Sequence, residues 1–229
     1  MNSSHLKAVA SGLLAVVAVS NAATPLTTGE VDIGIAYEGG LLGFHLHDEE
    51  KDIEYEPSEA VLVVGAGSLQ LSPGGAFSFL GPAGTPNWVL PAVENPGLLY
   101  LGLSGEELDA PDWVGSLTVS LQSVVGPGNF YLWNTDAFGN PVVFMDSASG
   151  ISDGDRVAVS PGSHAHYNWG FSQPGSYSVF LEASGVHVDE GLVTSGPVAF
   201  QFEVVPEPST YLLALFGLGS LLAIRRLQQ

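Results

Sequence analysis

The chain has 229 residues, of which 45% are hydrophobic, with 29 glycines, 15 prolines, no cysteine and a formal net charge of −19. The content of core-forming residues favours a folded, turn-rich protein over a disordered one. The lack of cysteine excludes disulfides and thiolate metal sites. An acidic surface repels phosphate backbones, which excludes nucleic acid as a partner; it attracts divalent cations and keeps an exported protein soluble.

The first segment, residues 1–23, has the three parts of a secretory signal peptide. A short region with Lys7 precedes an apolar run over 8–19, and small residues follow at Ala22 and Ala23. We expect signal peptidase to cleave after one of these alanines. A retained N-terminal anchor is the alternative, but the apolar run is too short to span a bilayer comfortably.

The central part, residues 24–204, alternates apolar and polar residues with a period of two, as half-buried antiparallel strands do. The clearest runs are 116–122, 177–183 and 200–204. Further strands are expected at 31–37, 41–47, 60–64, 98–103, 129–133, 141–145, 156–160 and 166–171. Because turn signals separate many short strands, the pattern predicts a single all-β domain, an antiparallel β-sandwich of Ig-like type. Residues 65–97, rich in glycine and proline, are expected to form a long excursion on its edge.

Histidines form two His-x-His pairs in this domain: His45 and His47, and His164 and His166. On a strand, residues i and i+2 point to the same face, so each pair can aim two imidazoles at one point. If the pairs lie on neighbouring strands, they could bind a divalent transition metal such as zinc, with Asp48 or Glu49 adding oxygen. His187 is a weaker candidate. The alternative is a purely structural role for both pairs, in the core or on exposed strands.

No catalytic signature is found in the sequence. It lacks a Gly-x-Ser-x-Gly elbow, a His-Glu-x-x-His motif, a phosphate-binding glycine loop and any cysteine nucleophile. We therefore expect a non-enzymatic protein. A competing function is an exopolysaccharide-binding module that stacks sugars on exposed aromatics, although tryptophan on alternating strands is more often core. The tryptophans are Trp88, Trp113, Trp133 and Trp169.

The last segment, residues 205–229, combines a proline-flanked triplet, an apolar run over 211–224 and two arginines. The run is expected to be helical, but it is shorter than the roughly 20 residues of a stable membrane span. The arginines favour the cytoplasmic side, which places the folded body outside the inner membrane. The residues that define this pattern are Pro206, Glu207, Pro208, Arg225 and Arg226.

This segment resembles a PEP-CTERM sorting signal. The resemblance implies a Gram-negative bacterium and transient anchoring of the chain in the inner membrane. It also implies cleavage near the triplet by an exosortase, a membrane cysteine protease, which releases the protein to the cell envelope, surface or extracellular matrix. An ordinary C-terminal anchor is the alternative.

A second resemblance spans most of residues 27–204. The run HAHYNWGFSQPGSY, from His164 to Tyr177, is similar to the H-x-H-x-N-W-x-F-x-x-P-G-x-Y signature of the choice-of-anchor M domain, also called the actinobacterial surface-anchored domain. Residues 28–37 and 126–133 fit other blocks of that family. Members carry different C-terminal anchors, and some are linked with metal-uptake transporters. The resemblance implies a surface protein and favours a metal role, but it transfers no activity.

Overall fold

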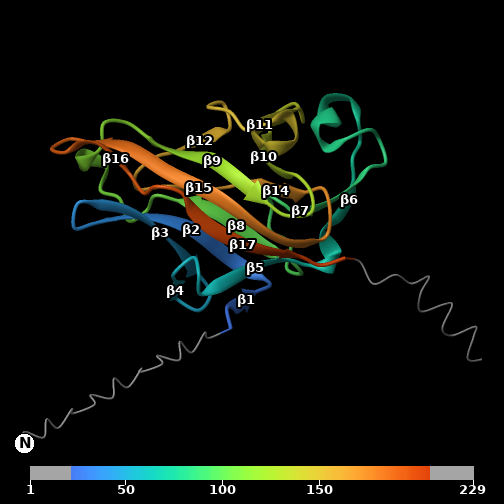
Figure 1. Ribbon diagram of the computed structural model, residues 1–229, viewed down its shortest axis with the longest axis horizontal. Coiled ribbons are helices and arrows are strands. Elements are labelled where there is room, and N and C mark those ends of the chain that lie inside the picture. Colours follow the sequence, from blue (N-terminus) through green and yellow to red (C-terminus); the bar gives the residue numbers. More distant parts are fainter. Residues whose placement is uncertain (1–21, 207–229) are drawn as a thin grey trace, which may run out of the picture.

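The computed structural model describes residues 22–206, which form an all-β body (Figure 1). Its helices are short 3-10 turns: η1 (Ala66–Ser68), η2 (Gly75–Leu80), η3 (Ala110–Asp112) and η4 (Ser147–Ser149). Within this part, no helix has the length and apolar character needed to cross a membrane. The expected signal helix and the hydrophobic helix over 211–224 lie outside the described residues.

The largest sheet has seven strands in the order β1-β5-β17-β15-β9-β12, with β16 also paired to β15. The long strand β15 (Gly175–His187) pairs antiparallel with β17 and β9, whereas β5 runs parallel to both β1 and β17. The other strands are β1 (Thr24–Leu26), β5 (Ala60–Val64), β9 (Leu117–Val125), β12 (Arg156–Val159), β16 (Gly191–Thr194) and β17 (Val198–Val204).

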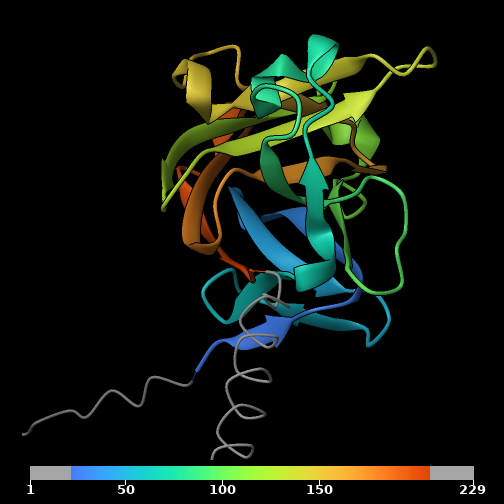
Figure 2. The ribbon, with the colours of Figure 1, turned by 90° about the vertical axis from the view of Figure 1, so that its right-hand side faces the viewer.

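Two five-stranded sheets complete the body. One runs β13-β8-β2-β3-β4, and the other β11-β10-β14-β7-β6. In Figure 2 two strands of the second, β10 and β11 (yellow-green to yellow), lie above the blue strands β2 and β3. The first sheet contains β2 (Gly29–Glu38), β3 (Leu41–Asp48), β4 (Ile53–Tyr55), β8 (Leu99–Ser104) and β13 (His164–His166). The second contains β6 (Leu69–Leu71), β7 (Pro86–Leu90), β10 (Phe130–Thr135), β11 (Pro141–Asp146) and β14 (Asn168–Phe171).

The inner faces of all three sheets share one hydrophobic core. Trp169 of β14 is fully buried, and its Nε1 donates a hydrogen bond to the carbonyl of Leu101 in β8 at 3.0 Å. Phe202 of β17 packs against Trp169 and Phe171, with ring centroids 6.1 and 5.0 Å away. Aromatic rings of this size bury large apolar areas, so these contacts hold the three sheets together.

The predicted all-β class is confirmed. The sheets contain parallel strand pairs in addition to the expected antiparallel ones. For example, β8 pairs in parallel with β2 after a long connection. The turn expected at Gly39 and Gly40 joins β2 to β3, and both glycines have positive φ, which favours glycine there.

Residues 65–97 differ from the expected edge excursion. They contain β7, which lies inside a sheet between β14 and β6. Residues 88–90 of β7 are buried on both faces, one against the shared core and the other beneath η2, where Val89 packs with Leu80. A strand covered on both sides has no alternation of polarity, so the period-two pattern does not reveal it.

Candidate functional site

All four histidines of the two pairs lie on one face of the sheet β13-β8-β2-β3-β4. They are not on neighbouring strands, because β8 and β2 lie between β13 and β3, a separation of about 14 Å at the usual strand spacing. The pairing register sets Asp32 opposite His47 and Gly102, and Gly102 opposite His166. A parallel row contains His45, Gly34, Ser104 and His164. Residues paired across strands share a face, so both pairs point to the same side.

Two glycines make room for larger side chains on this face. A Cβ on Gly34 would overlap Nε2 of His45, and a Cβ on Gly102 would overlap Oδ1 of Asp32. The side chains of His45 and Asp32 therefore lie across the neighbouring strand instead of standing upright. The result is a hollow of about 230 Å³ lined by Asp32, Gly34, Ile35, His45, His47, Glu49, Ser104, Glu106 and Glu107.

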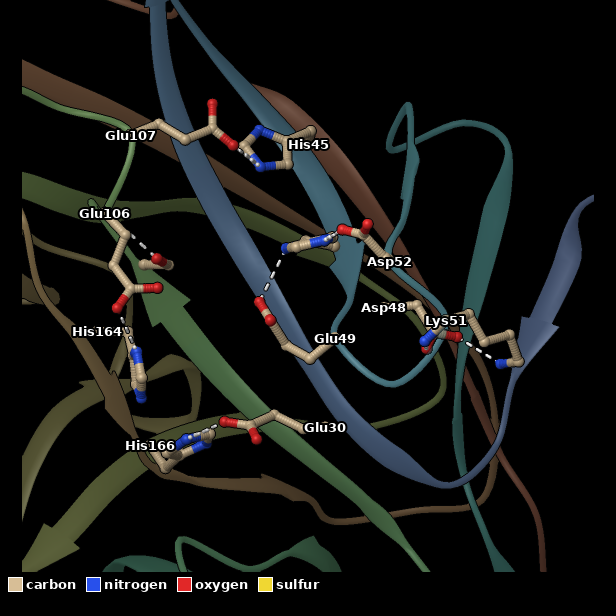
Figure 3. Close-up of polar contacts among 12 residues, drawn as sticks. Glu30, His45, Asp48, Glu49, Lys51, Asp52, Glu106, Glu107, His164 and His166 are labelled. Carbon is tan, nitrogen blue, oxygen red and sulfur yellow. Dashed lines mark hydrogen bonds and ion pairs between the residues drawn. The ribbon is translucent and has the colours of Figure 1, made fainter.

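Each histidine ring contacts a carboxylate from β2, from the residues after β3 or from the residues after β8 (Figure 3). The four contacts are His45 Nε2 to Glu107 at 3.0 Å, His47 Nδ1 to Glu49 at 2.8 Å, His164 Nδ1 to Glu106 at 2.9 Å, and His166 Nε2 to Glu30 at 3.1 Å. The sequence predicted the histidines but, apart from Glu49, missed these partners. Glu30 and Asp32 could have been found as polar residues spaced by two on an otherwise apolar strand.

Asp32 is the most unusual group on this face. Its residue is only 2% exposed, and Oδ1 has no hydrogen-bond partner among the described residues. Burial raises the pKa of this carboxyl from 3.8 to about 6; the nearby His164 opposes the rise, and Glu49 and Glu30 add to it. At neutral pH the carboxylate is therefore charged at a cost in free energy, which is typical of functional sites.

The pKa values of the two histidines of β13 shift in opposite directions. A hydrogen bond to Glu106 raises the pKa of His164 above 6.5, although partial burial opposes it. Burial lowers the pKa of His166, and Glu30 opposes that effect. The His166 ring stacks on Tyr100 with centroids 3.5 Å apart, and its Nδ1 lacks a hydrogen-bond partner within the described part. A neutral imidazole with a free ring nitrogen is the form that binds metals.

Three sets of side chains on this face place potential ligand atoms within 4.8 Å of one another. They are Glu30, His164 and His166; Asp32, Glu106 and His164; and His45, Glu54 and Glu107. In residues 22–206, none of these sets joins a histidine of β3 to one of β13. The geometry thus gathers nitrogen and oxygen atoms at two separate points, rather than four imidazoles at one. His47 lies apart from both points, beside Glu49 and Asp52.

The C-terminal end of the chain bears on where the protein is delivered. Residues 204–227 match the PEP-CTERM protein-sorting motif. This motif implies that the protein is exported and processed by exosortase, and that it reaches the cell envelope or surface. No curated protein and no solved structure gives a significant match to the chain. The resemblance to the choice-of-anchor M domain stays a prediction.

The sorting motif begins where the folded body ends. Strand β17 ends at Val204, and the next backbone N–H, that of Val205, donates to the carbonyl of Val64 at 2.9 Å. Pro206, the first residue of the triplet, is exposed. Cleavage after this point leaves every described strand intact. The other motif residues, Glu207, Pro208, Arg225 and Arg226, lie outside the described part.

Two other candidates from the sequence have structural roles. The four tryptophans are 0–8% exposed, so they are buried, as the sequence favoured, and do not form the sugar-stacking platform that was the alternative. Trp88, Trp113 and Trp169 belong to the shared core, and Trp133 packs with Leu80 of the covering segment. The ring of His187 packs between Tyr37 and Trp113, with centroids 4.7 and 5.4 Å away.

Proposed function

We propose that the exported body is a non-enzymatic envelope or surface protein that binds a divalent transition metal on its histidine face. Asp32, Glu106 and His164 would supply the first ligands, with His166 and Glu30 next to them. The observation that carries this proposal is the buried Asp32 carboxylate, whose Oδ1 has no partner in the described part, within ligand distance of His164 and Glu106.

The donor atoms suit an ion such as zinc. Zinc takes imidazole nitrogen and carboxylate oxygen, and sites with three protein ligands keep a fourth position for water or another ligand. The alternative is that the four histidine–carboxylate contacts only stabilise the fold. That alternative accounts for the exposed pairs, but it leaves the buried Asp32 carboxylate with no hydrogen bond at Oδ1 and with only the nearby His164 to offset its charge. A bound cation would supply the missing compensation.

The charge of the whole chain supports the same function. A net charge of −19 raises the local concentration of cations around the protein. The resemblance to a domain family linked with metal-uptake transporters agrees with a role in holding or presenting metal outside the cytoplasm. Polysaccharide binding through exposed tryptophans has no such support, because those side chains are buried.

Calorimetric titration of the purified protein with zinc and nickel tests the proposal. We expect saturable binding that weakens at least about tenfold in Asp32→Asn and in His164→Gln, as loss of a ligand or its supporting partner does. Asp153→Asn, in an exposed loop away from this face, is the matched control and should bind like the unmodified protein. Equal affinity in all four proteins would contradict the proposal.

His45→Gln distinguishes the two ligand sets. If the proposal is right, this change leaves the affinity at His164 within about twofold, because His45 belongs to the other set. A loss as large as that of His164→Gln would instead favour a single site shared by both pairs, as the sequence suggested.

A further inference from the structure

A second cavity, of about 420 Å³, lies on the outer face of the sheet β11-β10-β14-β7-β6. Its floor is formed by Val89 of β7 and Trp133 of β10, and one wall by Phe77 and Leu80 of η2. The covering segment, which contains η2, is the teal part at the top of Figure 2. The volume falls within the range of about 300–1,000 Å³ that small-molecule sites occupy.

The lining of this cavity is unusual for so acidic a chain. All of its lining residues lie in the described part, and none of them is charged. The polar ones are four amides and two hydroxyls: Gln70, Asn87, Asn134, Asn168, Ser72 and Thr135. The rest are apolar. An anion would meet no positive side chain here, and a cation would meet no carboxylate, so the lining suits an uncharged ligand.

One polar group in the cavity is fixed and unpartnered. Asn87 is 1% exposed, and its Nδ2 donates to the carbonyls of Leu80 at 3.0 Å and Thr85 at 3.2 Å. These two bonds orient the amide, while Oδ1 has no hydrogen-bond partner among residues 22–206. A buried acceptor left unpaired costs free energy, and a hydroxyl donor from a ligand would satisfy it.

A second amide builds the wall beside it. Asn168 of β14 accepts from the N–H of Ala92 at 3.1 Å and donates to the carbonyl of Trp133 at 3.2 Å. Both ends of this amide are thus bonded within the protein, which fixes this part of the cavity wall. At the rim, the exposed Gln70 offers a donor and an acceptor to whatever enters.

We propose that this cavity binds a neutral saccharide unit. A sugar ring has apolar C–H faces, which suit the exposed Leu71 and Val93 and the half-buried Phe77 of the lining, and hydroxyls, which suit Asn87 and Gln70. A purely apolar ligand would leave Asn87 Oδ1 unpaired. This site lies on a different sheet from the histidine face and needs no metal, so it stands independently of the metal-binding proposal.

The test is ligand-observed NMR on the purified protein with neutral hexasaccharides of glucose, mannose and xylose, with chelator present throughout. We expect saturable binding below about 10 mM for at least one of them. A hexamer of galacturonic acid, which is anionic, should not bind. Gln70→Ala and Asn87→Ser should each weaken binding about two- to tenfold, the range that one hydrogen bond supports.

Gln122→Ala, on the exposed side of β9 in another sheet, is the matched control and should bind like the unmodified protein. Because Asn87 is buried, its variant counts only if its thermal unfolding stays cooperative; Gln70→Ala, at the rim, tests the proposal without that risk. No saturable binding of any neutral hexasaccharide would overturn the proposal, and so would preference for the uronate or equal binding by Gln70→Ala and Gln122→Ala.

Discussion

Replacing Asp32 by asparagine should make the metal-free protein more stable at neutral pH. The pKa of this carboxyl rises from 3.8 to about 6 on folding, because burial disfavours its charge. The folded protein therefore holds this proton more tightly than the unfolded chain does. The carboxyl destabilises the fold increasingly as pH rises from about 4 through 6, and at pH 7.5 the cost is about 3 kcal/mol, at about 1.4 kcal/mol for each pKa unit. Asparagine keeps the shape of the side chain and removes the charge.

Urea unfolding at pH 4, 5, 6 and 7.5, with chelator present, measures this effect. The Asp32→Asn protein should exceed the unmodified protein by up to about 3 kcal/mol at pH 7.5, and the gain should shrink toward zero near pH 4. Asp153→Asn, at an exposed position, controls for the general loss of a negative charge. A variant that is less stable at pH 7.5, or a gain that does not change with pH, would refute the reasoning.

Three further predictions concern the histidine face and the shared core. Glu106→Gln should lower the pKa of His164 toward 6.5 in an NMR titration, because it removes the charged hydrogen-bond partner; an unchanged pKa would contradict the contact. Gly102→Ala should destabilise the protein by about 1–3 kcal/mol in thermal unfolding, since the added methyl overlaps the carboxylate of Asp32; a neutral effect would mean that this side chain moves freely. Trp169→Phe should cost about 1–3 kcal/mol in urea unfolding, because a buried carbonyl of β8 loses its donor; a smaller loss would show that another donor replaces the indole.

Local patterns predicted much of the fold. The alternating strands β9, β15 and β17, and the β2–β3 hairpin with its two glycines, follow from residues close together in the sequence. Strand β7 does not, because burial on both faces removes the alternation that marks a half-exposed strand. The expected strand over 166–171 also divides at Tyr167, where the chain passes from β13 in one sheet to β14 in another.

The histidine face was predicted only in part. The spacing His-x-His correctly implied that each pair shares a face, and the structure puts both pairs on the same side of one sheet. Which strands are neighbours depends on contacts between distant residues, and the sequence pattern does not record it. For the same reason the sequence did not predict Glu106 and Asp32 as partners of His164. They lie near it only because β8 pairs with β2 and β13.

The most direct test of metal binding on the histidine face is to follow the ring signals of the histidines by NMR while zinc is added to the purified protein. The ring signals of His164 and His166 should shift first and saturate together, while those of His187, packed between two aromatic rings on another sheet, should stay unchanged. As pH falls below about 6.5, protons should compete and the same shifts should need more zinc. Absence of any saturable shift, or equal shifts in all the histidines, would contradict the account.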